Sequence, residues 1–114
     1  MQDCVFCKLL RKEIPSKVLF EDSQAVAFQD LHPQAPTHVL IVPRKHLSSL
    51  NDCTSADDAL LGHALAVAKE VAQQQGVGSS GYRIVLNTGE GAGQTVFHIH
   101  FHLLGGRTMS WPPG

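Results

Sequence analysis

The chain lacks a dominant charge and lacks any long apolar run. Nine Lys/Arg oppose ten Asp/Glu over 114 residues, for a net charge of −1, so no basic field favours binding to a nucleic-acid backbone. No stretch contains the roughly 18 consecutive apolar residues that a bilayer span requires. The first residues lack the basic and apolar regions of a signal peptide. We therefore expect neither a nucleic-acid partner nor a membrane partner.

Cysteine is also scarce, and its count is odd. The chain has three cysteines, and Cys4 and Cys7 are too close in sequence to suggest a disulfide framework. The sequence therefore favours a reducing, cytoplasmic location. Internal repeats and low-complexity linkers are missing too, and the length fits one compact domain. We expect residues 1–114 to form a single domain.

Hydrophobic periodicity predicts one long helix and about five strands. The predicted elements are a short helix over 4–12, strands over 18–21, 25–29, 38–42, 82–87 and 98–104, and a long helix ending near Gly76. Short turns join most neighbouring strands, which favours an antiparallel sheet covered on one face by the helix. The expected fold class is α+β.

The long helix has the clearest local signals. Ser55 is its predicted N-cap, Asp57 and Asp58 lie in its first turn, and Gly76 fits its C-terminal exit. Apolar residues at helical spacing predict its buried stripe: Leu60, Leu61, Ala64, Leu65, Ala68, Val71 and Ala72.

The most informative segment is 98–104, which reads HIHFHLL. Because successive side chains of a strand point to opposite faces, strand geometry places His98, His100 and His102 on one face. A helix would not let side chains two positions apart converge. The apolar residues are expected on the opposite face: Phe97, Ile99, Phe101 and Leu103.

Two chemistries fit this row of imidazoles, since imidazole acts as a nucleophile, a proton shuttle or a metal ligand. A glycine-rich loop over 88–94 precedes the row, and Asn87, Gln94 and Thr95 add polar groups, so a phosphate cradle is one interpretation. A His-x-His pair also holds catalytic zinc in some hydrolases. No Asp or Glu lies near 98–102 to support such a metal. The residues leave both chemistries open, and the glycine loop favours phosphate.

The pattern His-φ-His-φ-His-φ-φ, with φ apolar, resembles the signature of the histidine-triad (HIT) superfamily, and it is complete here. Further segments resemble the Hint branch of that superfamily, the nucleoside phosphoramidases: 11–15, 33–38, 61–63, 105–107 and 111–114. The resemblance implies a HIT-like fold with a five-stranded antiparallel sheet in each subunit of a homodimer. It implies cleavage of the P–N bond of purine nucleoside 5′-phosphoramidates, AMP or GMP derivatives, without an organic cofactor.

The resemblance also implies roles for the histidines. His100 would be the nucleophile and would form a covalent nucleotidyl-histidine that water hydrolyses. His102 and His38 would flank the phosphate, and His98 would help to orient His100. Two alternatives remain open, which are a dinucleoside polyphosphate hydrolase of the related Fhit branch and a non-catalytic nucleotide-binding regulator.

A nucleotide site is implied by residues spread over the whole chain. The positions that resemble the family's phosphate site are Asn87, Gly93, Thr95 and Val96. Asp30 matches the residue that bonds the ribose hydroxyls. The apolar slot around the base would contain Val5, Phe6, Leu9, Phe28 and Leu31. Trp111, in the C-terminal tail, would reach toward the partner subunit's site.

A metal is the last expectation. Cys4 and Cys7 form a Cys-x-x-Cys, and with His46 and His98 they resemble a Cys₂His₂ set that some bacterial-type members of the superfamily use to bind zinc. Such a zinc would be structural, because four protein ligands leave no open position for water. The alternative is two free thiols in a short helix.

Overall fold

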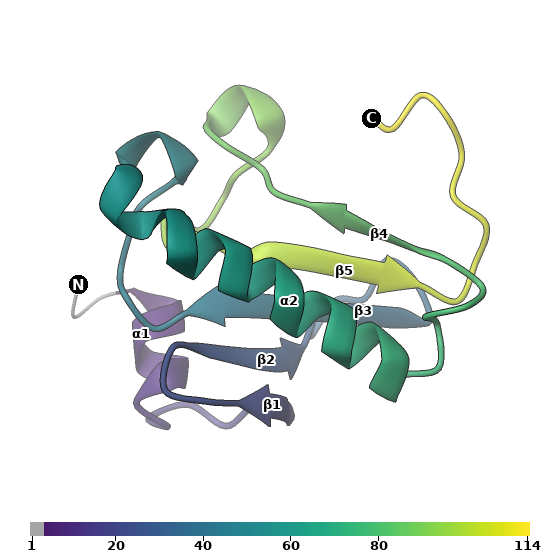
Figure 1. The fold of residues 1–114 in the computed structure, drawn as a ribbon, viewed down its shortest axis with the longest axis horizontal. Helices are drawn as coiled ribbons and strands as arrows, with labels where there is room; N and C mark the ends of the chain where they lie inside the picture. Colours follow the sequence, from purple (N-terminus) through teal and green to yellow (C-terminus); the bar gives the residue numbers. More distant parts are fainter. Residues whose placement is uncertain (1–3) are drawn as a thin grey trace.

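The computed structural model describes residues 4–114, so residues 1–3, on which the signal-peptide prediction partly rests, lie outside the described part. One antiparallel sheet has the strand order β1-β2-β3-β5-β4 (Figure 1). Its strands are β1 (Val18–Glu21), β2 (Ala25–Gln29), β3 (Thr37–Pro43), β4 (Tyr82–Val85) and β5 (Phe101–Gly105). A short helix, α1 (Val5–Leu10), and a long helix, α2 (Asp58–Gln74), complete the predicted α+β fold. Within residues 4–114, no helix has the length and apolarity to cross a membrane.

The two faces of the sheet carry different layers. Helix α2 lies across one face (Figure 1), where Ala27, Ile41 and Leu103 pack against its buried side chains. On the opposite face, Phe28 and Leu40 pack with Phe6 of α1 in a separate apolar cluster. The alternation of strand side chains explains this division. Helix α1 therefore covers part of the second face, whereas the sequence predicted a helix on one face only.

The buried stripe of α2 is made largely of small residues. Ala64, Ala68 and Val71 are fully buried, and their size lets the helix lie close to the sheet. The prediction is wrong for Leu65, which is 47% exposed, because it lies about 100° around the helix from Ala64. Val67, which the predicted stripe omits, is buried instead.

The start of the long helix also differs from the prediction. The N-cap of α2 is Asp57, not Ser55, and its side chain makes no capping bond to α2. A 3₁₀ turn over Ser55–Asp57 precedes α2, and Thr54 caps that turn. The Thr54 hydroxyl accepts from the Ala56 N–H, and the Asp57 carboxylate accepts from the Thr54 N–H at 3.0 Å. This reciprocal arrangement is a capping box. At the other end, Gly76 has a φ of 78° just beyond the helix, which confirms the predicted exit.

The histidine strand is shorter than predicted. β5 begins at Phe101, so His98 and His100 precede it, and Phe97 is 44% exposed instead of facing the core. The neighbouring strand β3 ends at Pro43, which has no N–H to offer a ladder, and the Ile99 N–H bonds to the Leu47 carbonyl instead. β4 ends at Val85, two residues earlier than predicted, because its last partner on β5 is His102.

Candidate active site and metal centre

A cavity of about 360 Å³ lies between α1 and the sheet, and His100 and His102 line it. Its volume is in the range of small-molecule sites. The residues predicted for the nucleotide slot that line it are Val5, Phe6, Leu9, Phe28, Asp30, Leu31, Thr95 and Val96. The sheet supplies the floor and α1 supplies a wall, so a flat apolar group fits beside the imidazoles.

His100 is held in one tautomer by the backbone. Its Nδ1–H donates to the His98 carbonyl at 2.8 Å, so in the neutral ring Nε2 carries the lone pair. His100 is 8% exposed, and its ring packs against the Phe6 ring in a T-shaped arrangement with the ring centroids 4.8 Å apart. Burial lowers the pKa of His100 below its ordinary value. A neutral imidazole with a fixed, basic Nε2 is suited to nucleophilic attack.

His102 is oriented by His38, which is buried on the adjacent strand β3. The Gln34 N–H donates to His38 Nδ1 at 3.0 Å, so the proton of neutral His38 lies on Nε2. That Nε2–H donates to His102 Nδ1 at 2.9 Å, which leaves His102 with a free Nε2–H. Burial, together with the nearby charges of His100 and His38, lowers the pKa of His102 to about 4. At neutral pH His102 therefore acts as an uncharged hydrogen-bond donor.

Asp30 extends this network on the rim of the cavity. Its Oδ1 accepts from the His32 N–H at 2.7 Å, and its Oδ2 lies 3.5 Å from His38 Nε2. The ligand atoms of Asp30, His38 and His102 gather within 4.8 Å, which has the dimensions of a metal site. His38 Nε2 holds a proton, however, so this cluster is a hydrogen-bond network and not a metal centre.

Cys4, Cys7, His46 and His98 form a second cluster, whose ligand atoms also lie within 4.8 Å of one another. The sulfur–nitrogen distances from Cys4 and Cys7 to His98 Nδ1 are 3.4 and 3.6 Å, and that from Cys7 to His46 Nδ1 is 3.4 Å. The two Nδ1 atoms are 3.1 Å apart. Tetrahedral zinc with ordinary bond lengths separates sulfur from nitrogen by about 3.6 Å and nitrogen from nitrogen by about 3.3 Å. The donor set therefore fits zinc in both chemistry and spacing.

The tautomer of His98 agrees with this fit. His98 is fully buried, and its Nε2–H donates to the Pro43 carbonyl at 2.7 Å, so the lone pair lies on Nδ1, which faces the thiols. A carbonyl partner on the remote ring nitrogen is the usual support of a metal-bound histidine. The His98 backbone carbonyl holds His100, so one residue connects the candidate metal site to the cavity.

The loop before the histidines is organised by Gln94, which the sequence suggested only as an added donor. Its buried side chain donates to the carbonyls of Ser48 and Val96 at 2.7 and 3.1 Å and accepts from the Gly89 N–H at 2.9 Å. Both N–H groups of this amide are therefore used within the protein, and its contacts shape the loop. Gly93, at φ 91°, continues the same turn.

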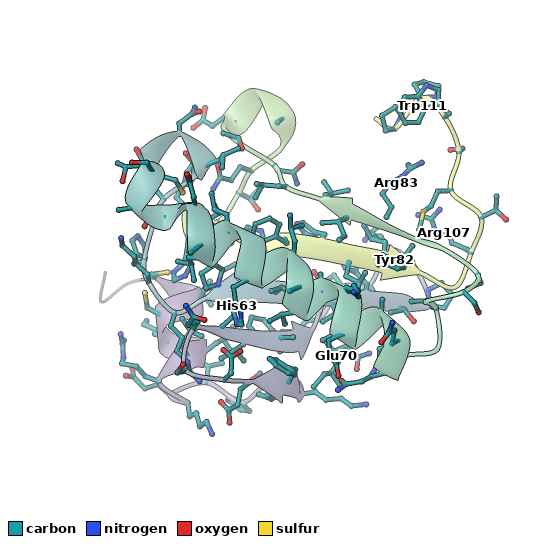
Figure 2. All side chains as sticks on the ribbon, in the orientation of Figure 1. His63, Glu70, Tyr82, Arg83, Arg107 and Trp111 are labelled. Carbon is teal, nitrogen blue, oxygen red and sulfur yellow. The ribbon has the colours of Figure 1, made fainter. Side chains whose placement is uncertain are left out.

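Several predicted residues lie outside the cavity wall. Asn87, Gly93 and Trp111 do not line it, and neither do the buried His38 and His98. Trp111 is 81% exposed beyond β4, at the other end of the long axis from α1, with the Arg83 guanidinium 5.9 Å from its ring (Figure 2). Arg83 also borders a larger, more open hollow of about 550 Å³, which contains no histidine.

Other residues of the cavity were missed by the sequence. Leu40 and Ser16 line it, and Gln34 determines the tautomer of His38 through its backbone N–H. In the sequence, Leu40 could be related to the site only by its position two residues after His38, which places both side chains on the same face of the strand. That spacing does not predict which face of the sheet contains the cavity. His63 on α2 is directed elsewhere, since its Nε2 lies 2.7 Å from the Asp22 carboxylate.

The chain is similar in sequence and in fold to several known proteins. The model of the HIT domain family matches residues 11–109. A 14 kDa zinc-binding protein of Zea mays is 50% identical over 112 residues, which cover 96% of this chain and 87% of the maize protein. A crystal structure of a HIT family hydrolase from Legionella pneumophila has a TM-score of 0.96 and 53% identity, and covers 98% of this chain and 100% of that one. The histidine triad nucleotide-binding protein of Candida albicans has a TM-score of 0.83 and 34% identity, and covers 96% of this chain and 83% of that one.

Proposed function

Because the chain belongs to the HIT domain family, we propose that it is a nucleotide-binding hydrolase that cleaves purine nucleoside 5′-phosphoramidates at the P–N bond, with residues 1–114 acting as one HIT domain. Two related proteins, a HIT family hydrolase and a histidine triad nucleotide-binding protein, support the general class. The single observation that carries the proposal is His100, whose Nδ1–H is held by a backbone carbonyl so that Nε2 is the basic atom of a cavity-lining ring.

The proposed reaction has two displacements. The substrate nitrogen takes up a proton from solvent, His100 Nε2 attacks the α-phosphorus, a P–N bond to the histidine forms, and the bond to the substrate nitrogen breaks as the neutral amine leaves. Water then attacks the nucleotidyl-histidine and loses a proton to solvent, which releases the nucleoside monophosphate and restores neutral His100. The free Nε2–H of His102 donates to the phosphoryl oxygens while charge develops on them.

The chemical character of the side chains around the cavity suggests where the ribose and the base of the nucleotide bind. The carboxylate of Asp30 is an acceptor for the ribose hydroxyls, and the apolar wall formed by Phe6, Phe28 and Leu31 receives the purine. Thr95 and Val96 border the phosphate, and Asn87 and Gly93, which do not line the cavity in the free chain, are the other two positions proposed for the phosphate site. In the homodimer that we propose, Trp111 extends to the partner subunit's site.

Cys4, Cys7, His46 and His98 would hold a zinc ion. It would supply a structural cross-link between the N-terminal helix and the sheet beside His98, and no Lewis-acid chemistry, because four protein ligands leave no open position for water.

The test is turnover of a fluorogenic adenosine 5′-phosphoramidate, followed by mass analysis of protein trapped with a slow substrate. We expect amine release and a nucleotide adduct on His100. Diadenosine polyphosphates are offered in parallel, and faster turnover of these would favour the polyphosphate hydrolase instead. Binding of AMP without turnover of either substrate would identify a non-catalytic regulator and refute the proposal.

A further inference from the structure

Helix α1 belongs to both the metal centre and the cavity. Its N-cap, Cys4, and its third residue, Cys7, carry two of the four metal-binding atoms. The residues between and after them, Val5, Phe6 and Leu9, form one wall of the cavity. A helix of six residues is too short to be stable without external contacts. Its position on the sheet therefore depends on what its two sides contact.

Phe6 makes the closest connection between the two sites. It is 6% exposed and lies between the two cysteines in sequence. Its ring is edge-on to His100 at 4.8 Å, to Phe28 at 5.8 Å and to His98 at 6.0 Å. The same ring thus contacts a metal-site residue, the proposed nucleophile and the floor of the base slot. A shift of α1 away from the sheet would change all three contacts together.

We propose that metal binding at Cys4, Cys7, His46 and His98 and nucleotide binding in the cavity are cooperative, with Phe6 as the residue that couples them. This inference rests on the proposed function, since it takes the cavity to be a purine nucleotide site. A metal that fastens the two cysteines to the two histidines holds α1 in the position in which its apolar residues meet the base. A bound base in turn holds α1 in the position in which the cysteines meet the histidines.

The coupling is reciprocal by thermodynamic necessity. If the metal strengthens nucleotide binding by some factor, the nucleotide strengthens metal binding by the same factor. Coupling between sites typically amounts to about 5- to 150-fold, and for one short helix we expect about tenfold. A second connection between the two sites is the hydrogen bond from His100 Nδ1 to the His98 carbonyl, which orients the nucleophile. AMP carries the base and the phosphate but no leaving group, so its affinity measures binding against the wall formed by α1 without the chemical step.

The experiment uses the intact chain and AMP. Calorimetry gives the Kd for AMP with the zinc-loaded protein and with protein freed of metal by a chelator, and a chromogenic chelator gives the Kd for zinc with and without saturating AMP. We expect both ratios to be about tenfold and equal within error. Equal AMP affinity in the two forms, within about twofold, overturns the coupling. Failure of the zinc-loaded protein to bind AMP instead refutes the proposed function.

Hydrogen exchange distinguishes a local displacement of helix α1 from unfolding of the whole domain. After chelation we expect faster exchange within residues 4–12 while α2 stays protected. Loss of protection along α2 would mean that the metal holds the whole domain together, and the proposal would then be wrong.

A substitution at the coupling residue completes the test. Phe6→Leu keeps all four metal ligands but removes the ring, and we expect the ratio between the two AMP affinities to fall toward one. Phe97→Leu is the matched control, because Phe97 is half-exposed and does not line the cavity. If the ratio of AMP affinities between the zinc-loaded and metal-free forms is unchanged in Phe6→Leu, then Phe6 does not couple the two sites.

Discussion

His38 donates its Nε2–H to His102 Nδ1 across 2.9 Å, although the two residues are 64 positions apart in the chain. The pairing of β3 with β5 places Leu40 opposite His102, so His38 lies diagonal to His102 on the same face. The backbone N–H of Gln34 fixes the proton of His38 on Nε2. His102 consequently presents a donor, and His100 presents a lone pair, so neighbouring histidines of one motif have opposite hydrogen-bonding properties.

The first prediction concerns the ionisation of His102. Its pKa of about 4 is lowered by burial and then by the charges of His100 and His38, so His38→Gln is expected to raise it toward the ordinary value by removing one repulsive charge. NMR titration of the imidazole protons measures this shift. His63→Gln, on α2, is the control and should leave the pKa of His102 unchanged. A pKa of His102 near 6.5 in the unsubstituted protein would contradict the predicted environment.

The same pKa predicts a pH dependence of stability. Since His102 has a pKa of about 4 in the folded protein and about 6.5 when unfolded, the unfolded chain takes up its proton first. The free energy of unfolding should therefore decline as the pH falls from about 6.5 to 4. In His102→Gln this decline should be smaller, though not absent, because burial also lowers the pKa of His38 and His100. Urea midpoints across this pH range test the difference.

Leu31 provides a test of the base slot at little cost to folding. It lines the cavity but is 80% exposed, so Leu31→Ala should change the free energy of unfolding by less than about 0.5 kcal/mol. A base that covers the leucine would lose about 1 kcal/mol of apolar contact, which corresponds to about fivefold weaker AMP binding. Leu65→Ala, an exposed leucine of α2, is the control. Undiminished affinity in Leu31→Ala would place the base elsewhere.

Gln94 is predicted to matter for stability and, through the loop, for turnover. Gln94→Leu would leave the Ser48 and Val96 carbonyls and the Gly89 N–H without their present partner. Each unpaired buried group costs about 1–3 kcal/mol, so thermal unfolding should occur several degrees lower. The exposed Gln74→Leu serves as the comparison. If both variants unfold at the same temperature, the loop does not depend on this amide.

The metal centre predicts a distinct spectrum. Protein loaded with cobalt(II) should show the intense visible bands of tetrahedral coordination and a sulfur-to-cobalt charge-transfer band. Cys7→Ser should weaken both, because it replaces a thiolate ligand, whereas Cys53→Ser should leave them unchanged. Weak octahedral bands in the unsubstituted protein, or zinc content far below one equivalent after purification without chelator, would argue against the Cys₂His₂ site.

Local pattern was sufficient for most of the elements. The helical spacing of Ala64, Ala68 and Val71 and the exit at Gly76 depend on neighbours within the same helix, and the structure agrees with both. The start of β5 was missed because it depends on Pro43 of another strand. The exposure of Leu65 and Phe97 was missed for a related reason. Periodicity predicts which apolar residues share a face, but the extent of the neighbouring elements that pack on that face decides which of those residues are buried.

The sequence alone determined which functional and structural motifs this protein contains, because each motif is a short-range pattern. These motifs are an alternating row of histidines, a Cys-x-x-Cys, a glycine-rich loop and one amphipathic helix. The tertiary structure decided which nitrogen of each histidine carries the proton. That choice depends on the Gln34 N–H and the Pro43 carbonyl, groups that only folding brings to the rings. It divided the three histidines between a candidate metal site, a nitrogen with a free lone pair and a hydrogen-bond donor, and it placed α1 against both that site and the cavity.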